Sequence, residues 1–309
     1  MPRFSLSNLV IFAAAVPLFA SAAPDATEPA PVFPAYQHPV MTWVPPYGIS
    51  KSKNRLNQTF DGVTMADGLT HLGLQFWTPT KEGGVAYAGP TDADVADFVK
   101  WGHDHGIRVL LCVYNGAHSW DWNLARAGFA EHRDAFAQAL VTEADRLHLD
   151  GVDIDLEGNG SFEADKAPFL DFMRNISAKL HAENKHLTVD SFSHIWNAPN
   201  SGWWKELFPF VDGLTTMGYE SLGAKAADWK SYAGQKADAG EGASKFMLGM
   251  PAHRDAWQGN TAAEQLAWVV SDGGVGVSIW DAQLNNGAWV EAGTWAALQK
   301  VAGKVRSKK

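Results

Sequence analysis

The sequence predicts an α/β protein, a single closed (β/α)8 barrel of the TIM type. From residue 40 onward, short apolar runs alternate with amphipathic stretches. Several runs are apolar on both faces, as expected for parallel strands covered by helices. Eight such repeats in about 265 residues fit a closed barrel. An open doubly wound sheet is the alternative, but it usually has a glycine-rich turn after its first strand, which "WVPPYGIS" is not.

The eight predicted strands are short apolar runs bounded by turn residues. In chain order they are "VMTWV" (40–44), "THLGLQFW" (70–77), "IRVLLCVY" (107–114), "LDGVDIDLE" (149–157), "HLTVDSFS" (186–193), "VDGLTTMGY" (211–219), "KFMLGM" (245–250) and "VGVSIW" (275–280). Only about 25 residues separate the last two runs, too few for an added domain between strands 7 and 8.

The helices between these strands differ in how clearly the sequence signals them. The helix over 91–105 begins with the cap pair Thr91 and Asp94 and ends at Gly106. The helices after the first and fifth strands are weakly signalled, so their ends are not assigned. The remaining predicted helices cover 128–148, 163–184, 261–271 and 293–305.

Composition and charge indicate a globular protein that does not bind nucleic acid. The 309 residues are 46% hydrophobic and 19% charged, which is sufficient apolar material for a full core. A net charge of −9 argues against nucleic acid as a partner. The single cysteine, Cys112, lies in the apolar run "VLLCVY", so we expect a buried, inert thiol.

The N-terminus has the features of a secretory signal. Arg3 precedes the apolar core "LVIFAAAVPLFA", and Ala20-Ser21-Ala22 forms an A-x-A cleavage site. The core is too short to span a bilayer. We therefore expect the chain to be exported and residues 1–22 to be removed by cleavage near Ala22. We also expect the mature protein to be a monomer with no membrane partner. Residues 23–37 are predicted as a proline-rich linker and 38–305 as the barrel domain.

Three carboxylates follow one another at every second position of the fourth strand. Asp153, Asp155 and Glu157 share one face, while the apolar residues between them occupy the other. In a barrel, catalytic groups lie at the carboxyl ends of strands. Like-charge repulsion keeps the outermost carboxyl protonated, which suits a general acid. The alternative is a set of structural or Ca²⁺-binding carboxylates, but calcium loops are polar and rich in glycine.

At this strand the sequence resembles a known family. "DGVDIDLE" resembles the D-G-x-D-x-D-x-E signature of glycoside hydrolase family 18, the chitinases and endo-β-N-acetylglucosaminidases. "THLGLQFW" is similar to the family's second strand, "TMGYE" to its M-x-Y-D segment and "GVSIWD" to its eighth strand. The resemblance covers most of residues 40–303.

The resemblance implies roles for six residues. Glu157 matches the general acid, and Asp155 the residue that orients and polarises the substrate's 2-acetamido group. Asp153 matches the residue that shares a proton with Asp155. The other matches are Tyr219 beside the acetamido oxygen, Met217 lining the site and Trp280 under the sugar at subsite −1.

Two positions depart from the family's pattern. Glu220 stands where the family usually has Asp, so its role as a substrate-binding residue is open. The third strand usually ends S-x-G-G, but here it reads "CVYNG", which leaves the shape of the neighbouring loop open.

Aromatic residues supply candidate sugar platforms, because pyranose rings stack on aromatic faces. The strand-end candidates are Trp43, Trp77 and Trp280, each with packing in the core as the alternative. Candidates in loops are Trp120, Trp122, Trp196, Trp203, Trp204 and Trp257. We predict no metal site and no cofactor, because "HDH" at 103–105 has the wrong spacing for a helical metal pair.

The predicted function is that of a secreted glycoside hydrolase. The resemblance implies cleavage of β-1,4 bonds next to N-acetylglucosamine by a substrate-assisted, retaining route. The absence of an added domain suggests a shallow cleft and endo-acting cleavage of chitin or chito-oligosaccharides. The alternatives are an endo-β-N-acetylglucosaminidase acting on N-glycans or peptidoglycan-like polymers, and a non-catalytic chitinase-like lectin.

Overall fold

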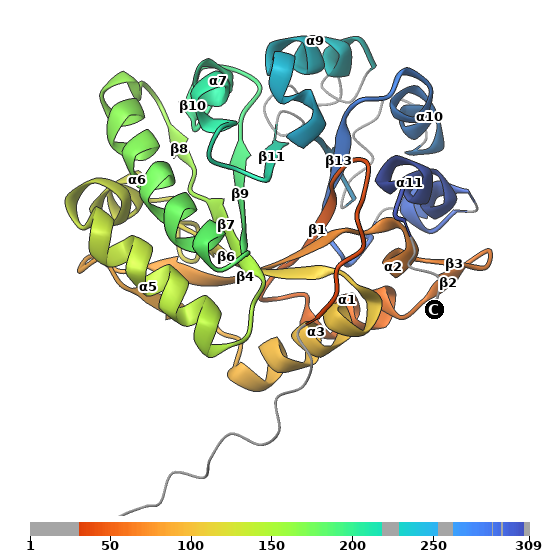
Figure 1. Cartoon of the computed structure of the whole chain (residues 1–309), viewed down its shortest axis with the longest axis horizontal. Helices are drawn as coiled ribbons and strands as arrows, with labels where there is room; N and C mark the ends of the chain where they lie inside the picture. Colours follow the sequence, from red (N-terminus) through yellow and green to blue (C-terminus); the bar gives the residue numbers. More distant parts are fainter. Residues whose placement is uncertain (1–30, 218–228, 253–261, 286, 292, 306–309) are drawn as a thin grey trace, which may run out of the picture. The chain divides into compact units, whose positions relative to one another are not determined.

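A computed structural model describes residues 31–217, 229–252, 262–285, 287–291 and 293–305. Eight parallel strands form a closed barrel, because β1 pairs with both β13 and β4. The (β/α)8 prediction is therefore confirmed (Figure 1). The barrel strands are β1 (Val40–Val44), β4 (His71–Pro79), β6 (Arg108–Tyr114), β7 (Gly151–Asp155), β9 (His186–Ser191), β11 (Gly213–Thr216), β12 (Phe246–Pro251) and β13 (Gly276–Trp280).

Helices surround the barrel on its outside (Figure 1). They are α1 (Ile49–Leu56), α2 (Met65–Gly68), α3 (Asp92–His105), α4 (Trp122–Arg126), α5 (Arg133–Arg146), α6 (Glu163–Ala182), α7 (Trp204–Leu207), α9 (Trp229–Ala239), α10 (Ala262–Asp272) and α11 (Thr294–Ala302). The stretch predicted as one helix over 128–148 is instead a π-helical turn, Ala127–Glu131, followed by α5. No helix in the described ranges has the length and apolar character needed to cross a membrane.

Three short antiparallel strand pairings lie outside the eight-stranded barrel. A small antiparallel strand, β5 (Val85–Tyr87), extends β4. A hairpin joins β2 (Thr59–Phe60) to β3 (Val63–Thr64). At the carboxyl end of the barrel, β8 (Gly158–Asn159) pairs with β10 (Asn197–Ala198) and so links the loops after β7 and β9.

Helix α3 begins and ends as its sequence predicts. Thr91 and Asp94 form a capping box, in which the Thr91 side chain accepts a hydrogen bond from Asp94 N and the Asp94 carboxylate accepts one from Thr91 N. Gly106 ends the helix at φ 64°, in the left-handed region that glycine enters without strain.

The core has two layers, as expected for a barrel wrapped by helices. The larger layer lies between the strands and the helices, and a smaller cluster fills the barrel itself. The inner cluster comprises Met41, Trp43, Leu110, Cys112 and Met247, with Trp280 packed against it. Cys112 is fully buried, as predicted, and burial raises the pKa of its thiol well above the usual range.

The described end of the predicted linker packs against the barrel. Phe33 lies 4.3 Å from the Arg108 guanidinium, and Tyr36 meets the ring of His71 edge-on. Gln37 N donates to Ala302 O at 2.7 Å. Phe33, Tyr36 and Gln37 of the predicted linker therefore contact the barrel, and the boundary at 38 stays a prediction. The sequence does not show this packing, because its prolines predict an extended segment without indicating whether that segment lies on the barrel or in solvent.

Candidate active site

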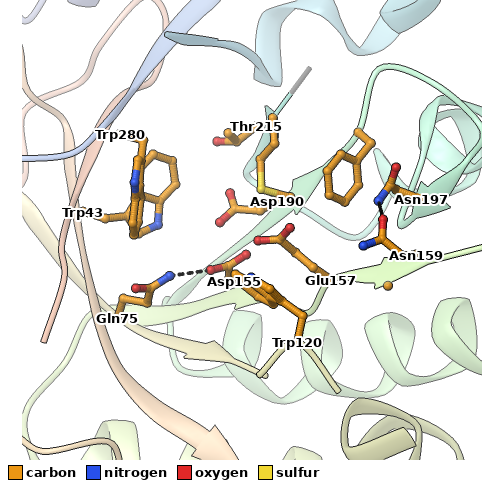
Figure 2. A pocket seen from close by; sticks show the side chains of 13 residues that line it. Trp43, Gln75, Trp120, Asp155, Glu157, Asn159, Asp190, Asn197, Thr215 and Trp280 are labelled. Atoms are coloured by element: carbon orange, nitrogen blue, oxygen red, sulfur yellow. Dashed lines mark hydrogen bonds between the residues drawn. The ribbon is translucent and has the colours of Figure 1, made fainter. Parts of the chain in front are cut away.

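A pocket opens at the carboxyl ends of the barrel strands (Figure 2). Its walls come from residues that lie far apart in the sequence, because parallel strands bring their carboxyl ends to one face of the barrel. The lining residues are Trp43, Gln75, Trp120, Asp155, Glu157, Gly158, Asn159, Asp190, Phe192, Asn197, Thr215, Met217 and Trp280.

Asp153 is the deepest of the three predicted carboxylates and has full hydrogen bonding within the protein. Its Oδ2 accepts a hydrogen bond from Trp43 Nε1 at 2.8 Å, and its Oδ1 accepts one from Thr188 Oγ1 at 2.5 Å. Burial raises its pKa, while these two donors act in the opposite direction. Asp153 does not line the pocket, so it influences the chemistry through Asp155.

Asp155 lines the pocket at the end of β7. Its Oδ2 accepts a hydrogen bond from Gln75 Nε2 at 2.8 Å. Burial, followed by repulsion from Asp153, raises the pKa of Asp155 to about 7, against the lowering effect of hydrogen bonds from Gln75 and Glu157. The Glu157 carboxyl lies beside that of Asp155 on the pocket wall (Figure 2). The pair is therefore able to share a proton near neutral pH.

Glu157 lies two residues beyond the end of β7, although the sequence predicts the strand to reach it. An asparagine holds its backbone in place of strand pairing. Glu157 N donates to Asn115 Oδ1 at 2.8 Å, and Asn115 Nδ2 donates to Glu157 O at 2.9 Å. Asn115 is the asparagine of "CVYNG", so this departure from the family pattern positions the predicted acid.

Trp43, Trp280 and Met217 line the pocket, as predicted. The indoles of Trp43 and Trp280 lie 6.2 Å apart between ring centroids, tilted by 48°. Trp43 is 2% exposed and its Nε1 donates to Asp153, so little of its ring is accessible to a ligand. Trp280 is half-buried and offers the larger aromatic face to a ligand.

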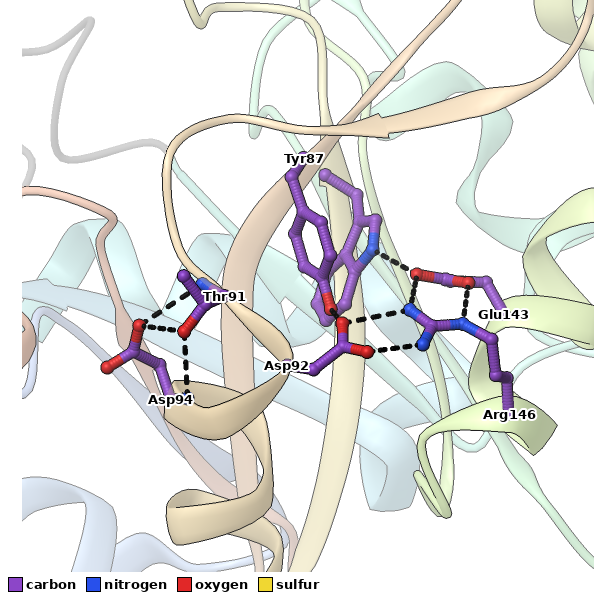
Figure 3. Close-up of polar contacts among 7 residues, drawn as sticks. Tyr87, Thr91, Asp92, Asp94, Glu143 and Arg146 are labelled. Carbon is purple, nitrogen blue, oxygen red and sulfur yellow. Dashed lines mark hydrogen bonds and ion pairs between the residues drawn. The ribbon is translucent and has the colours of Figure 1, made fainter.

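The prediction that Trp77 is a sugar platform is wrong. Trp77 is fully buried and lies outside the pocket. Its Nε1 donates to Glu143 at 3.1 Å, next to the Glu143–Arg146–Asp92 network in Figure 3. A bulge between Leu74 and Trp77 is the reason. It reverses the alternation of faces, so Gln75 faces the barrel interior and Trp77 faces the helices.

The remaining predicted site residues are either outside the described ranges, exposed, or packed inside the protein. Tyr219, Glu220 and Trp257 lie outside the described residues. Trp120 is 50% exposed and lines the pocket, and Trp196 is 74% exposed on the loop after β9. Trp122 donates to Asp165, while Trp203 and Trp204 are buried.

Sequence reasoning missed Gln75, Asn115 and Asp190. All three are almost fully buried, and Gln75 and Asp190 line the pocket. A signal existed for each, because each is a polar residue in or just after an apolar run that reads as a strand. Such a residue is costly to bury without a purpose.

The arrangement combines a pair of carboxyls able to share a proton with an aromatic wall. That combination suits acid catalysis on a sugar whose apolar face lies against indole rings. Within the described ranges, no group of three or more His, Cys, Asp or Glu side chains is arranged to hold a metal ion.

Comparison with known proteins finds a family model and many similar structures. The model of glycosyl hydrolases family 18 matches residues 43–302. A chitinase from Chromobacterium violaceum superposes with a TM-score of 0.64 at 16% identity, covering 85% of this chain and 98% of that one. The spore cortex-lytic enzyme SleL from Bacillus megaterium superposes with a TM-score of 0.63 at 12% identity, covering 94% and 81%.

A curated relative is similar over a shorter stretch. A "chitinase-like effector" from Moniliophthora roreri is 27% identical over 117 residues. This match covers 35% of the present chain and spans 29% of that relative's length.

Proposed function

Because the chain belongs to glycosyl hydrolases family 18, we propose that it is a secreted, endo-acting glycosidase that cleaves β-1,4 bonds next to N-acetylglucosamine. The observation that carries the proposal is the Asp155–Glu157 carboxyl pair in a pocket walled by Trp43 and Trp280. A binding protein needs no carboxyl able to pass on a proton, whereas a glycosidase does.

The proposed reaction uses the substrate's own acetamido group as the nucleophile. Glu157 gives its proton to the leaving glycosidic oxygen, while the acetamido carbonyl oxygen attacks the anomeric carbon. The positive charge that develops on the acetamide nitrogen is stabilised by Asp155, which Gln75 holds in place through its Oδ2. Water then opens the oxazoline ring, and Glu157 takes up a proton again.

Chitin and chito-oligosaccharides are the proposed substrates. The similarity in fold to chitinases supports this choice. Glycoprotein N-glycans and peptidoglycan-like polymers are the alternatives within the same chemistry. The A-x-A site at Ala20–Ala22 supports export of the chain.

The test is a digestion panel read by mass spectrometry. Purified protein is incubated with chito-oligosaccharides, high-mannose glycopeptides and peptidoglycan fragments. We expect chito-oligosaccharides to be cut internally, with retention at the anomeric centre. Glu157→Gln should fold normally and turn over about 10²–10⁴-fold more slowly. Near-normal turnover of that folded variant would remove Glu157 from the role of acid.

The mechanism has a separate test. A thiazoline analogue of the oxazoline should inhibit, because an enzyme binds such an intermediate mimic more tightly than substrate. Oligosaccharides without an acetyl group at subsite −1 should not be cut. Detection of a stable sugar ester on Asp153, Asp155 or Glu157 would contradict substrate assistance.

A non-catalytic sugar-binding protein is the second candidate. It is favoured by the partial match to a relative named a chitinase-like effector. Binding of chito-oligosaccharides by calorimetry, together with no product from any substrate in the panel, would establish it over the glycosidase.

A further inference from the structure

A third carboxyl, Asp190, lines the pocket beside those of Asp155 and Glu157. It is on β9, is 4% exposed and lines the pocket. Its register partner on the next strand, β11, is Thr215, which also lines the pocket and is 2% exposed. Figure 2 shows the Asp190 carboxyl between Thr215 and the carboxyls of Asp155 and Glu157.

Asp190 and Thr215 differ from the deeper carboxylate Asp153 in their hydrogen bonding. Asp190 Oδ1 and Thr215 Oγ1 are buried, and neither makes a hydrogen bond of normal geometry to a described residue, although the two side chains lie close enough to interact with each other. By contrast, both oxygens of Asp153 are bonded within the protein. Leaving a buried polar atom unpaired costs about 1–3 kcal/mol. Two neighbouring unpaired atoms at a pocket wall are therefore placed to bind a ligand.

The charges around Asp190 favour its neutral form. Among the described residues, the ionisable groups facing it are Asp153 and Asp155 on β7, Glu157 beyond that strand and Cys112 on β6. None of the lining residues is Lys, Arg or His. Burial first, and then the three carboxyls, raises the pKa of Asp190 well above its usual range, against a lowering effect of the neighbouring Thr215 hydroxyl. A neutral carboxyl donates one hydrogen bond and accepts others, as the Thr215 hydroxyl also does.

We propose that Asp190 and Thr215 form a further substrate-binding point, which takes a hydroxyl group of the amino sugar in the pocket. A sugar hydroxyl accepts a hydrogen bond from the Asp190 carboxyl and donates one to Thr215 Oγ1, so it satisfies both unpaired atoms. The inference rests on the proposed function, because it needs a sugar in this pocket. It makes the pair specificity-determining, because an analogue without the hydroxyl leaves both atoms unpaired.

The experiment measures binding in the Glu157→Gln background, where turnover does not interfere. The probe is penta-N-acetylchitopentaose, titrated by calorimetry near pH 6. Asp190→Leu keeps the branched shape but has no polar atom, and it should weaken binding about 10- to 100-fold, as should Thr215→Val. Asp190→Asn keeps a neutral donor and acceptor and should stay within about threefold.

A matched control separates a binding role from loss of a buried polar group. Ser278 on β13 is also buried with an unpaired hydroxyl, but it does not line the pocket. Ser278→Ala should leave affinity unchanged. Affinity of the Glu157→Gln protein should also fall as pH rises and Asp190 ionises, and Asp190→Asn should abolish that fall.

The outcomes separate this inference from the function on which it rests. If Glu157→Gln binds the pentamer and a folded Asp190→Leu or Thr215→Val binds it equally well, the binding point is wrong and the glycosidase proposal stands. If Glu157→Gln does not bind the pentamer at all, both proposals fall. Should Asp190→Leu not fold, a loss of more than tenfold in Asp190→Asn would overturn the neutral donor role.

Discussion

The Asn115 side chain holds the backbone of Glu157, which elsewhere in the barrel would be held by hydrogen bonds to a neighbouring strand. Glu157 lies beyond β7, and its N–H and C=O groups are both bonded by the Asn115 side chain. Asn115 Nδ2 also donates to Asp121 O at 3.0 Å, which ties the loop after β6 to the same point. The general acid is thus held by a buried amide that is 1% exposed.

We predict that Asn115→Ala lowers kcat more than it changes KM. The substitution removes the two hydrogen bonds from Asn115 to the backbone of Glu157 and lets the acid move, and a displacement of about 1 Å costs about 10²-fold in rate. Stability should fall by about 1–3 kcal/mol. Steady-state kinetics and thermal unfolding measure both effects. Exposed Asn123, in the same region, is the control, since Asn123→Ala should change neither.

Asp155 should destabilise the folded chain as pH rises. Its folded pKa of about 7 lies above the ordinary value of 3.8. The unfolded chain therefore releases this proton first, and stability declines from about pH 4 to about pH 7. Asp155→Asn removes that term and should stabilise the protein at pH 7 by up to about 4 kcal/mol while lowering activity. An unfolding free-energy difference between the two proteins that does not grow with pH would contradict this.

At the scale of elements, the irregularity of β4 determines which side chains reach the pocket. The bulge before Trp77 sends Gln75 toward Asp155 and Trp77 toward α5. A regular strand would put Trp77 on the same face as Gln75 and would bring a large indole into the barrel.

Trp77→Phe is therefore predicted to affect stability and not activity. The variant keeps most of the aromatic packing but loses the hydrogen bond to Glu143, so the free energy of unfolding should fall by about 1–2 kcal/mol. Chemical denaturation gives that value, and kcat/KM should remain within about twofold of the wild type. Trp280→Phe is the comparison, and it should reduce affinity for chito-oligosaccharides. A large loss of activity in Trp77→Phe would restore Trp77 as a platform.

At the scale of the whole molecule, the two ends of the barrel carry different chemistry. The carboxyl end holds the acidic pocket, whereas at the amino end Tyr36 contacts a histidine pair, His71 and His186, of which His71 is fully buried. His71 Nε2 and His186 Nδ1 lie 3.0 Å apart, and His71 Nδ1 lies 2.8 Å from Thr70 Oγ1. Burial lowers the pKa of His71, and it lowers that of His186 to about 4.

The histidine pair should make the fold sensitive to acid. Both folded pKa values lie below the ordinary 6.5, so the stabilisation is complete above about pH 6.5 and is lost as pH falls toward 4. His186→Gln does not titrate and should reduce the loss over that interval by up to about 3 kcal/mol. Unfolding free energies at pH 7, 5.5 and 4 measure it. Exposed His118→Asn should behave as the wild type, and an equal effect there would rule out the buried pair as the cause.

The sequence by itself determined the barrel, the cluster of Asp153, Asp155 and Glu157 at the end of β7, and the limits of α3. These features are local, since strand alternation, capping residues and apolar periodicity act over a few neighbouring residues. Trp77 shows the limit of that reasoning, because a bulge changes which face a side chain occupies without leaving a clear sequence signal.

Only the tertiary structure decided which residues from different strands meet. Gln75 bonds Asp155 across 80 residues of chain, Asn115 bonds Glu157 across 42, and Asp190 pairs with Thr215 through the β9–β11 register. Each partner is one of many buried polar residues until the barrel closes. Closure places the strand ends together in a low-dielectric pocket, and that placement gives Asp155 and Asp190 their raised pKa values.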